Sequence, residues 1–358
     1  MKKFLALSMT GILAFTMLTG CSSPAPKETK PPVEQKQEEQ KPADTKAEET
    51  TAADSKETYE MVIALHTNDG TIEDQAIDRF AESVNKKSEG RLSVVVFPGA
   101  TIGTEEENLE QISSNEIQGS IFGDVMTSQL AADLDPTVTP FLFSSIDDVL
   151  SVWSGDVGQR INDACVQNGN LQVLGVGRRG ARYLLANKEI TAPEQVKGLK
   201  LRLPSISNWV TIWESIGALA TPISFSEVYT SLQTGVVDAF ESTAELTDSG
   251  SYYDVVKYAM DTHHLYGLFH FAVCESWLKE LPEDLQELII EEGKAACEWG
   301  DEQMASYEAE MVQSLQDHGM TIVEVDNDAF KEAAMPSINK IVEKWQDGVW
   351  DSISEYVE

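Results

Sequence analysis

Short apolar runs alternate with amphipathic stretches from Tyr59 to the end of the chain. The runs 61–65 and 92–97 predict strands, and between them apolar residues recur at helical spacing over 72–87. Further strands are expected at 117–122, 172–176, 181–185 and 200–203, and further helices at 105–113, 147–168, 207–216 and 225–234. This alternation is typical of an α/β architecture with mostly parallel sheets covered by helices on both faces.

One long segment contains no proline between Pro282 and about Gln316, and helix-forming residues dominate it. Pro282 suits the first position of a helix. A continuous helix here would be roughly 50 Å long, enough to brace two small domains. A break into two helices at Gly293 or Gly300 is the alternative.

The first 20 residues predict a secretion signal. Lys2 and Lys3 precede an apolar run, 4–18, that is short for a bilayer span, and the sequence LTGC follows at 18–21. This ending resembles a bacterial lipobox, which implies cleavage before Cys21 and attachment of lipid, including palmitate, to its sulfur. An ordinary signal peptide with a chance cysteine is the alternative. Acyl chains would anchor the protein without a transmembrane helix.

Residues 21–58 predict a disordered linker behind that anchor. After Cys21 the segment has no aromatic residue, five prolines, and six basic against nine acidic residues. Such a composition cannot bury enough apolar surface to offset the entropy lost on ordering the backbone. We expect an extended stalk.

The charge of the chain excludes several classes of protein. Its 60 acidic and 26 basic side chains give a formal net charge of −34, and 42% of residues are hydrophobic, which is enough for a packed core. A surface this acidic would repel a phosphate backbone, so we expect neither a nucleic-acid-binding protein nor a basic membrane-surface protein.

One segment of the chain is basic although the chain as a whole is acidic. Residues 177–202 contain seven basic and two acidic side chains. Arg182 and Arg202 lie inside apolar, strand-like stretches, where burial of a charge requires a partner. That partner is either an internal carboxylate or the carboxylate of a ligand, which fits the planar guanidinium fork. A predicted helix starting near Ser207 would add attraction for an anion, which makes Ser205 and Trp209 candidate ligand contacts.

No motif in the sequence indicates catalysis, a cofactor or a metal. Residues 175–180 fit G-x-G-x-x-G, but a strand rather than a helix is expected next, and Arg202 stands near where an acidic residue would be required. A metal site could be suggested by three histidines: His263, His264 and His270. Histidines that are packed in the core or exposed on the surface are the favoured interpretation. Three cysteines match no zinc pattern and allow at most one disulfide: Cys165, Cys274 and Cys297.

Two long runs resemble a known family. The runs 196–204 (VKGLKLRLP) and 221–238 (TPISFSEVYTSLQTGVVD) are similar to signature segments of TRAP-transporter solute-binding proteins. Weaker similarity at 80–82, 90–92, 97–103 and 277–284 extends the resemblance from Tyr59 to about Ile353.

The resemblance implies a two-lobe, periplasmic-binding-protein-like α/β fold with mixed sheets, crossing hinge strands and a long helix spanning both lobes. Lobe I would comprise 59–180, completed by about 268–305, and lobe II 181–267, completed by about 306–358. It further implies an extracytoplasmic, lipid-anchored protein, on the surface of a one-membrane cell or the periplasmic face in a two-membrane cell.

By the same resemblance, the cleft closes on a small organic acid. The acid then passes to the small and large membrane subunits of an ion-driven permease, without ATP. Delivery of the signal to a sensor kinase or chemoreceptor is the alternative.

The resemblance also assigns site residues. Arg202 matches the arginine that pairs with the ligand carboxylate, Arg182 a second arginine of the pocket, and Phe225 an aromatic wall. Glu105 falls near an acidic position at the edge of the cleft. Where the family usually has GQEN, this chain has AFES at 239–242, so Ser242 replaces a ligand-contacting asparagine and reaches less far.

Overall fold

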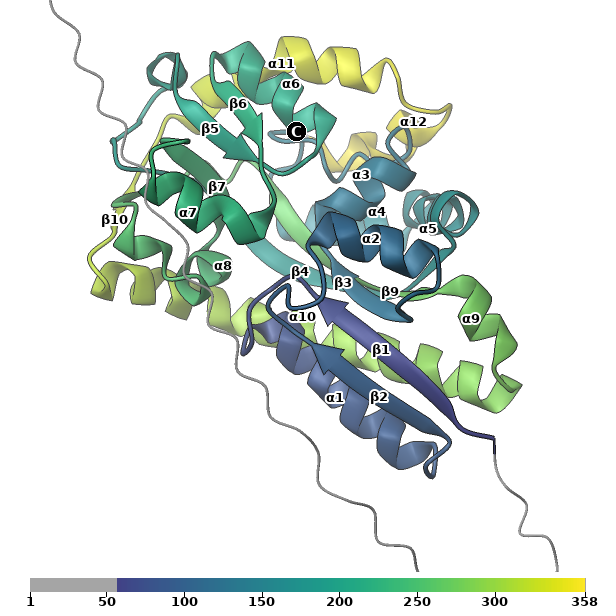
Figure 1. The fold of residues 1–358 in the computed structure, drawn as a ribbon. Coiled ribbons are helices and arrows are strands. Elements are labelled where there is room, and N and C mark those ends of the chain that lie inside the picture. The colour runs from purple at the N-terminus through teal and green to yellow at the C-terminus, as the bar shows by residue number, and fades with distance from the viewer. Residues whose placement is uncertain (1–56, 358) are drawn as a thin grey trace, which may run out of the picture. The chain divides into compact units, whose positions relative to one another are not determined.

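A computed structural model describes residues 57–357 of the chain (Figure 1). The predicted signal sequence, Cys21 and the linker up to residue 56 lie outside the described residues. Within 57–357, every helix is too short or too polar to cross a lipid bilayer.

The described region alternates strands and helices, as the hydrophobic pattern predicted. The strands are β1 (Tyr59–Leu65), β2 (Leu92–Phe97), β3 (Gly119–Phe122), β4 (Leu171–Ala186), β5 (Lys200–Leu203), β6 (Leu219–Pro222), β7 (Ala239–Thr243), β8 (Tyr258–Met260), β9 (Tyr266–Cys274) and β10 (Thr321–Val323). The helices are α1 (Ile72–Lys87), α2 (Glu105–Ser113), α3 (Asp124–Leu130), α4 (Ile146–Ser154), α5 (Asp156–Gly169), α6 (Ser207–Ile216), α7 (Val228–Gln233), α8 (Ala244–Ser249), α9 (Glu275–Glu280), α10 (Glu283–Asp317), α11 (Asn327–Val342) and α12 (Val349–Ile353).

The sheet is mixed. Its strand order is β2-β1-β3-β9-β4-β7-β5-β6, with β8 paired to β4 and β10 paired to β8. The outer groups β1–β3 and β5–β7 are parallel, whereas β9 and β4 run antiparallel to each other and to their neighbours. We call the elements around β1–β3 the first lobe and those around β5–β7 the second lobe.

β4 joins the two lobes as one 16-residue strand, where two separate strands were predicted. A bulge, and not a break, lies between the two predicted strands. The pairing with β9 shifts register between Val173 and Gly175 and again between Arg178 and Gly180, whose φ is +102°. The expected boundary between the lobes at residue 180 therefore falls inside a continuous strand.

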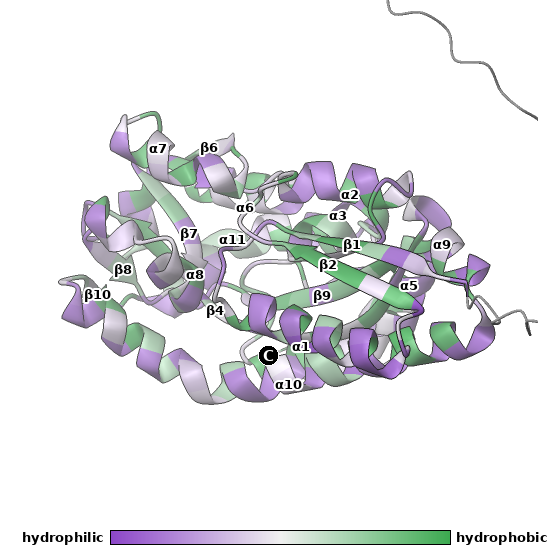
Figure 2. Ribbon diagram, turned by 60° about the horizontal axis from the view of Figure 1, so that its bottom comes forward, coloured by the Kyte–Doolittle hydropathy of each residue, from purple (hydrophilic) through white to green (hydrophobic). Residues whose placement is uncertain are grey.

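The long helix α10 is unbroken over 35 residues, which settles the alternative of two helices. It packs along α1, β4 and α8 and so contacts both lobes (Figures 1 and 2). Its glycines are sites of close packing: a Cβ at Gly293 would lie 2.6 Å from Leu174 Cδ1, and a Cβ at Gly300 would lie 2.9 Å from Phe269 Cζ. Figure 2 shows the strands as mainly hydrophobic, while α1 and α10 present hydrophilic residues.

Two predicted helices differ from the structure. The predicted helix 147–168 is divided into α4 and α5 because Gly155 adopts an extended conformation and serves as the end of one and the start of the other. The predicted helix 225–234 begins as a 3₁₀ turn, Phe225–Glu227, and continues as α7. The cysteines of the described region are free and buried.

The contact between β4 and α10 predicts the effect of a small substitution. A Cβ at Gly175 would lie 2.7 Å from Cys297 Cβ, so Gly175→Ala should lower the free energy of unfolding by about 1–3 kcal/mol. Chemical denaturation measures this change. Gly267→Ala is the control, because its new Cβ would meet no atom closer than 3.5 Å. Equal stability of both variants would show that the helix adjusts at no cost.

Candidate ligand-binding site

A small cavity lies between the lobes. Five of the seven ligand contacts predicted from the sequence line it: Arg182, Arg202, Glu105, Trp209 and Phe225. Three further titratable residues that were not singled out also line it: His66, Asp124 and Arg179. The cavity has a volume of about 30 Å³, room for no more than a few water molecules.

The two predicted serines are placed differently. Ser205 is exposed and lies outside the cavity lining, although its neighbours Pro204 and Ile206 belong to it. Ser242 is fully buried and is absent from the lining as well. Within the described region its Oγ has no hydrogen-bond partner. Because strand side chains alternate, Ser242 shares the face of Phe240, which packs against Tyr252, and lies opposite Glu241.

Arg202 is the least compensated of the three arginines in the cavity. It lies in β5, is 3% exposed, and its Nε donates a 2.7 Å hydrogen bond to the carbonyl of Ile223. Its Nη1 lies 4.0 Å from Glu241 Oε1, beyond hydrogen-bonding distance. Burial lowers the pKa of Arg202, and the attraction of Glu241 does not fully offset that effect. Among residues 57–357 the two Nη groups have no hydrogen-bond acceptor, so they are available to an anion.

Arg182 already has an internal partner, which was one of the two alternatives left open by the sequence. Its Nε donates to Glu241, a fully buried carboxylate of β7, and its guanidinium lies 4.9 Å from the ring of Trp209. Burial alone would raise the pKa of Glu241, but Arg182 and His264 outweigh it and hold the pKa below its usual range. His264 Nε2 is 3.6 Å from Glu241.

Arg179 brings a third guanidinium to the cavity, and the sequence did not single it out. Its Nη2 donates to Glu73 at 2.9 Å and its Nε to the other oxygen at 2.5 Å, and both side chains are buried. Glu73 therefore raises the pKa of Arg179 despite burial. In a regular strand, residues 179 and 182 would face opposite sides. The bulge at Arg178 and Gly180 turns both toward the cavity.

The first lobe contributes an acidic edge. Glu105, the first residue of α2, accepts a 2.6 Å hydrogen bond from the N–H of Gly123, and its Oε2 lies 3.6 Å from His66 Nε2. Burial raises the pKa of Glu105 and lowers that of His66 to about 4, where Arg179 adds to the effect. His66 is therefore neutral at pH 7.

A few hydrogen bonds connect the lobes around this cavity. The indole N–H of Trp209 donates to the carbonyl of Val138 at 2.8 Å. On the other side, Glu245 Oε1 in α8 accepts from the N–H of Ile72, the first residue of α1, at 2.6 Å. These hydrogen bonds join the two lobes beside the cavity.

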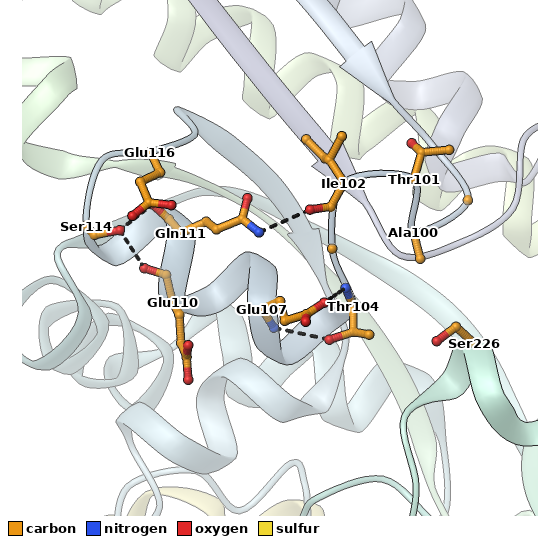
Figure 3. Close-up of a pocket in the computed structure, with 12 residues that line it drawn as sticks. Ala100, Thr101, Ile102, Thr104, Glu107, Glu110, Gln111, Ser114, Glu116 and Ser226 are labelled. Atoms are coloured by element: carbon orange, nitrogen blue, oxygen red, sulfur yellow. Dashed lines mark hydrogen bonds between the residues drawn. The ribbon is translucent and has the colours of Figure 1, made fainter. Parts of the chain in front are cut away.

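A wider groove of about 650 Å³ lies beside α2 (Figure 3). In Figure 3, Thr104 and Glu107 form the capping box that fixes the start of α2, and Ser226 of the second lobe lies opposite. The charged residues of its lining are all acidic: Glu107, Glu110 and Glu116. The groove therefore suits an anion poorly, and the small cavity with its arginines is the better candidate.

The model of "Bacterial extracellular solute-binding protein, family 7" (DctP) matches residues 63–345, most of the chain. The chain belongs to this family.

Proteins similar to this chain match it over most of its length. A solute-binding protein of Roseobacter denitrificans is 30% identical over 262 residues, which is 73% of this chain and 80% of the relative. A crystal structure of a TRAP periplasmic solute-binding protein from the same species, with bound L-galactonate, matches with a TM-score of 0.79 at 27% identity, covering 84% of this chain and 99% of that one. One from Sulfitobacter sp. NAS-14.1, with bound β-D-galacturonate, gives a TM-score of 0.78 at 26% identity, covering 83% and 99%.

Membership of family 7 confirms the predicted class of protein. The chain is an extracytoplasmic solute-binding protein of a TRAP transporter rather than an enzyme, and its fold is the two-lobe α/β fold of these proteins.

The contact between the lobes at Glu245 predicts a pH dependence. Burial, with Glu73 nearby, raises the pKa of Glu245 from 4.5 to about 7. Protonation of Glu245 therefore stabilises the folded protein. This stabilisation is fully present below pH 4.5 and is lost as the pH rises through 7. Glu245→Gln cannot ionise and keeps an oxygen for the N–H of Ile72. Relative to wild type, its free energy of unfolding should therefore increase by about 2–3 kcal/mol between pH 5 and pH 8.

Chemical denaturation at several pH values measures this difference. Glu110→Gln, which removes an exposed carboxylate of α2, should follow the wild-type profile. Parallel profiles for wild type and Glu245→Gln would rule out Glu245 as the titrating group.

Proposed function

We propose that this protein captures a small organic acid between its lobes, binds the carboxylate through Arg202, and delivers it to the small and large membrane subunits of a TRAP permease. Arg202 carries the proposal, because its guanidinium is buried and lines the cavity, while within the described residues neither of its Nη groups has a hydrogen-bond acceptor. A carboxylate supplies the missing charge and two acceptor oxygens. The ligands of the two structural relatives, L-galactonate and β-D-galacturonate, are both carboxylates.

Binding requires motion of the lobes. The cavity of about 30 Å³ is smaller than an organic acid of several carbons, so the acid enters while the lobes are apart. The bound acid then stabilises the molecules in which the lobes have closed around it, with a cavity that is larger than the one in this structure. Arg182, Glu105, Phe225 and Trp209 form the walls in this proposal, and Ser205 and Ser242 lie outside them.

The proposal includes a lipid anchor at Cys21, supported by the LTGC sequence at 18–21. An anchored protein with a stalk of more than 30 residues stays near the permease while its lobes remain in solution.

Arg202→Ala should weaken binding of the cognate acid at least about tenfold, because a hydrogen bond to a charged group contributes about 1.5–3 kcal/mol. Arg202→Lys should not restore it, since lysine lacks the planar fork. A thermal-shift screen of mono- and dicarboxylates identifies the acid, and titration calorimetry gives its Kd.

The matched control is Arg178→Ala. Arg178 lies on β4 but pairs with Asp301 and does not line the cavity, so this variant should bind like wild type. Wild-type affinity in Arg202→Ala would refute the assignment.

Cys21→Ser should abolish lipid attachment. In cells fed an alkyne analogue of palmitate, wild type and the control Cys165→Ser should be labelled and Cys21→Ser should not. Labelling of Cys21→Ser would contradict the anchor.

A further inference from the structure

Glu245 reaches from one lobe to the other. It lies in α8 of the second lobe and is 5% exposed. Its Oε1 accepts the 2.6 Å hydrogen bond from the N–H of Ile72, the first residue of α1 in the first lobe. That N–H is one of the groups at the start of a helix that have no acceptor within the helix. Glu245 therefore caps α1 from the opposite lobe.

A second hydrogen bond joins the same two regions. Asn68, in the loop before α1, donates from Nδ2 to the carbonyl of Ser249 at the end of α8, at 3.1 Å. In the proposed function the lobes separate to admit the acid. Separation breaks both bonds and returns the carboxyl group of Glu245 to water, so this group has two different surroundings in the two arrangements.

The surroundings of Glu245 in this structure favour its protonated form. Within residues 57–357 its Oε2 has no hydrogen-bond partner. Burial raises the pKa of Glu245 from 4.5 to about 7, and the buried carboxylate of Glu73 adds to this effect. The hydrogen bond from Ile72 and the charge of Arg179 oppose it only in part. The charge of Arg179 is already shared with Glu73, its ion-pair partner.

The other charged groups around this contact are bound elsewhere or exposed. On α1, Asp74 accepts a 2.8 Å hydrogen bond from the N–H of Gly70. The strands β4 and β7 contribute Arg182 and Glu241, which pair with each other. The remaining groups belong to α8, its following turn, α10 and the residue after α10: Asp248, bound to Ser314; Glu308, bound to the N–H of Ala181; His318, bound to the carbonyl of Ser314; and Asp254, exposed. None of these groups supplies a free cation to Glu245.

We propose that closure of the lobes takes up a proton at Glu245, so that the affinity of the protein for its organic acid rises as the pH falls. This inference rests on the proposed function, because it requires lobes that separate and close around the acid. Joined lobes hold the proton of Glu245 more tightly than water does, so protonation favours closure. At high pH, closure has to bury an ionised carboxylate beside that of Glu73, which is costly.

The effect is confined to a range of pH. Well below pH 4.5 Glu245 is protonated in both arrangements, and well above pH 7 it is ionised in both. In between, closure takes up close to one proton. The equilibrium constant for closure should therefore increase at least about tenfold from pH 8 to pH 5. The protein then releases its acid more readily in alkaline than in acidic surroundings.

The separation of the lobes can be measured without any acid. Thr101→Cys and Ser226→Cys place spin labels at exposed positions of opposite lobes, on the two sides of the groove beside α2 (Figure 3). Cys21→Ser in the same full-length chain restricts labelling to these positions, since the cysteines of the described region are buried. Pulsed electron paramagnetic resonance then gives the ratio of short to long distances, which should rise at least about tenfold from pH 8 to pH 5.

Glu245→Gln cannot ionise, so in this variant the ratio should change less than about threefold. Asp248→Asn is the matched control. Asp248 is the other carboxylate of α8, but it binds Ser314 of α10 and not the first lobe. The control should respond to pH like wild type.

Titration calorimetry measures the coupled proton directly. The probes are L-galactonate, D-galacturonate and the best acid of the thermal-shift screen, each in buffers that differ in ionisation enthalpy. At pH 6, wild type should take up at least about 0.5 proton more per bound acid than Glu245→Gln, and at pH 8 less than about 0.2 more. The comparison with the variant cancels protons exchanged by the acid itself and by other groups of the cavity.

The outcomes separate this inference from the proposed function. If the distances in the acid-free protein do not depend on pH, or if wild type and Glu245→Gln respond alike, the role of Glu245 is refuted, whichever acid binds. If the lobes respond to pH through Glu245 but no acid binds, the inference stands and the carboxylate site fails. If Glu245→Gln does not fold, Glu245→Ser, which also cannot ionise, takes its place in both measurements.

Discussion

A guanidinium group that is removed from water needs a negative partner. Three guanidinium groups meet in one small cavity of this protein. Glu73 and Glu241, both fully buried, neutralise Arg179 and Arg182. Glu241 is committed to Arg182 and lies 4.0 Å from Arg202. Among the described residues, Arg202 is therefore left without a hydrogen-bonded carboxylate, in a chain whose net charge is −34. In the proposed function, recognition of an acid depends on the unused Nη groups of Arg202, because the overall charge of the protein would repel the acid.

The cavity is lined by residues of both lobes, so in the proposed function ligand binding and lobe closure involve the same residues. Hydrogen bonds join the lobes beside the cavity, such as those of Trp209 with Val138 and of Glu245 with Ile72. A bond of this kind contributes only about 1 kcal/mol. The continuous elements β4 and α10, in contrast, tie the lobes together along their length. In the proposed function, the lobes separate at the cavity while this connection stays folded.

Much of this could be predicted locally, and the remainder depends on long-range pairing. Helices α1 and α2 have the bounds predicted from sequence, because Thr71 and Thr104 cap amphipathic stretches. Arg202 was recognised as a charge inside an apolar strand. Arg179 was not, because alternation assigns it to the opposite face from Arg182, and only the bulge brings the two together. The partners Glu73 and Glu241 are 106 and 59 residues away in sequence, a separation at which no local pattern reveals the pairing.

The bulge at Arg178 and Gly180 also has an evolutionary consequence. It uncouples side-chain direction from position along the strand, so the facing of Arg179 depends on one extra residue rather than on its own identity. Arg179 is itself the residue of β4 that has no partner on β9 at this bulge, so a one-residue deletion at this point would remove its guanidinium and leave the buried carboxylate of Glu73 without its ion pair. The charge that lines the cavity therefore depends on the length of β4 as well as on which amino acids occupy it.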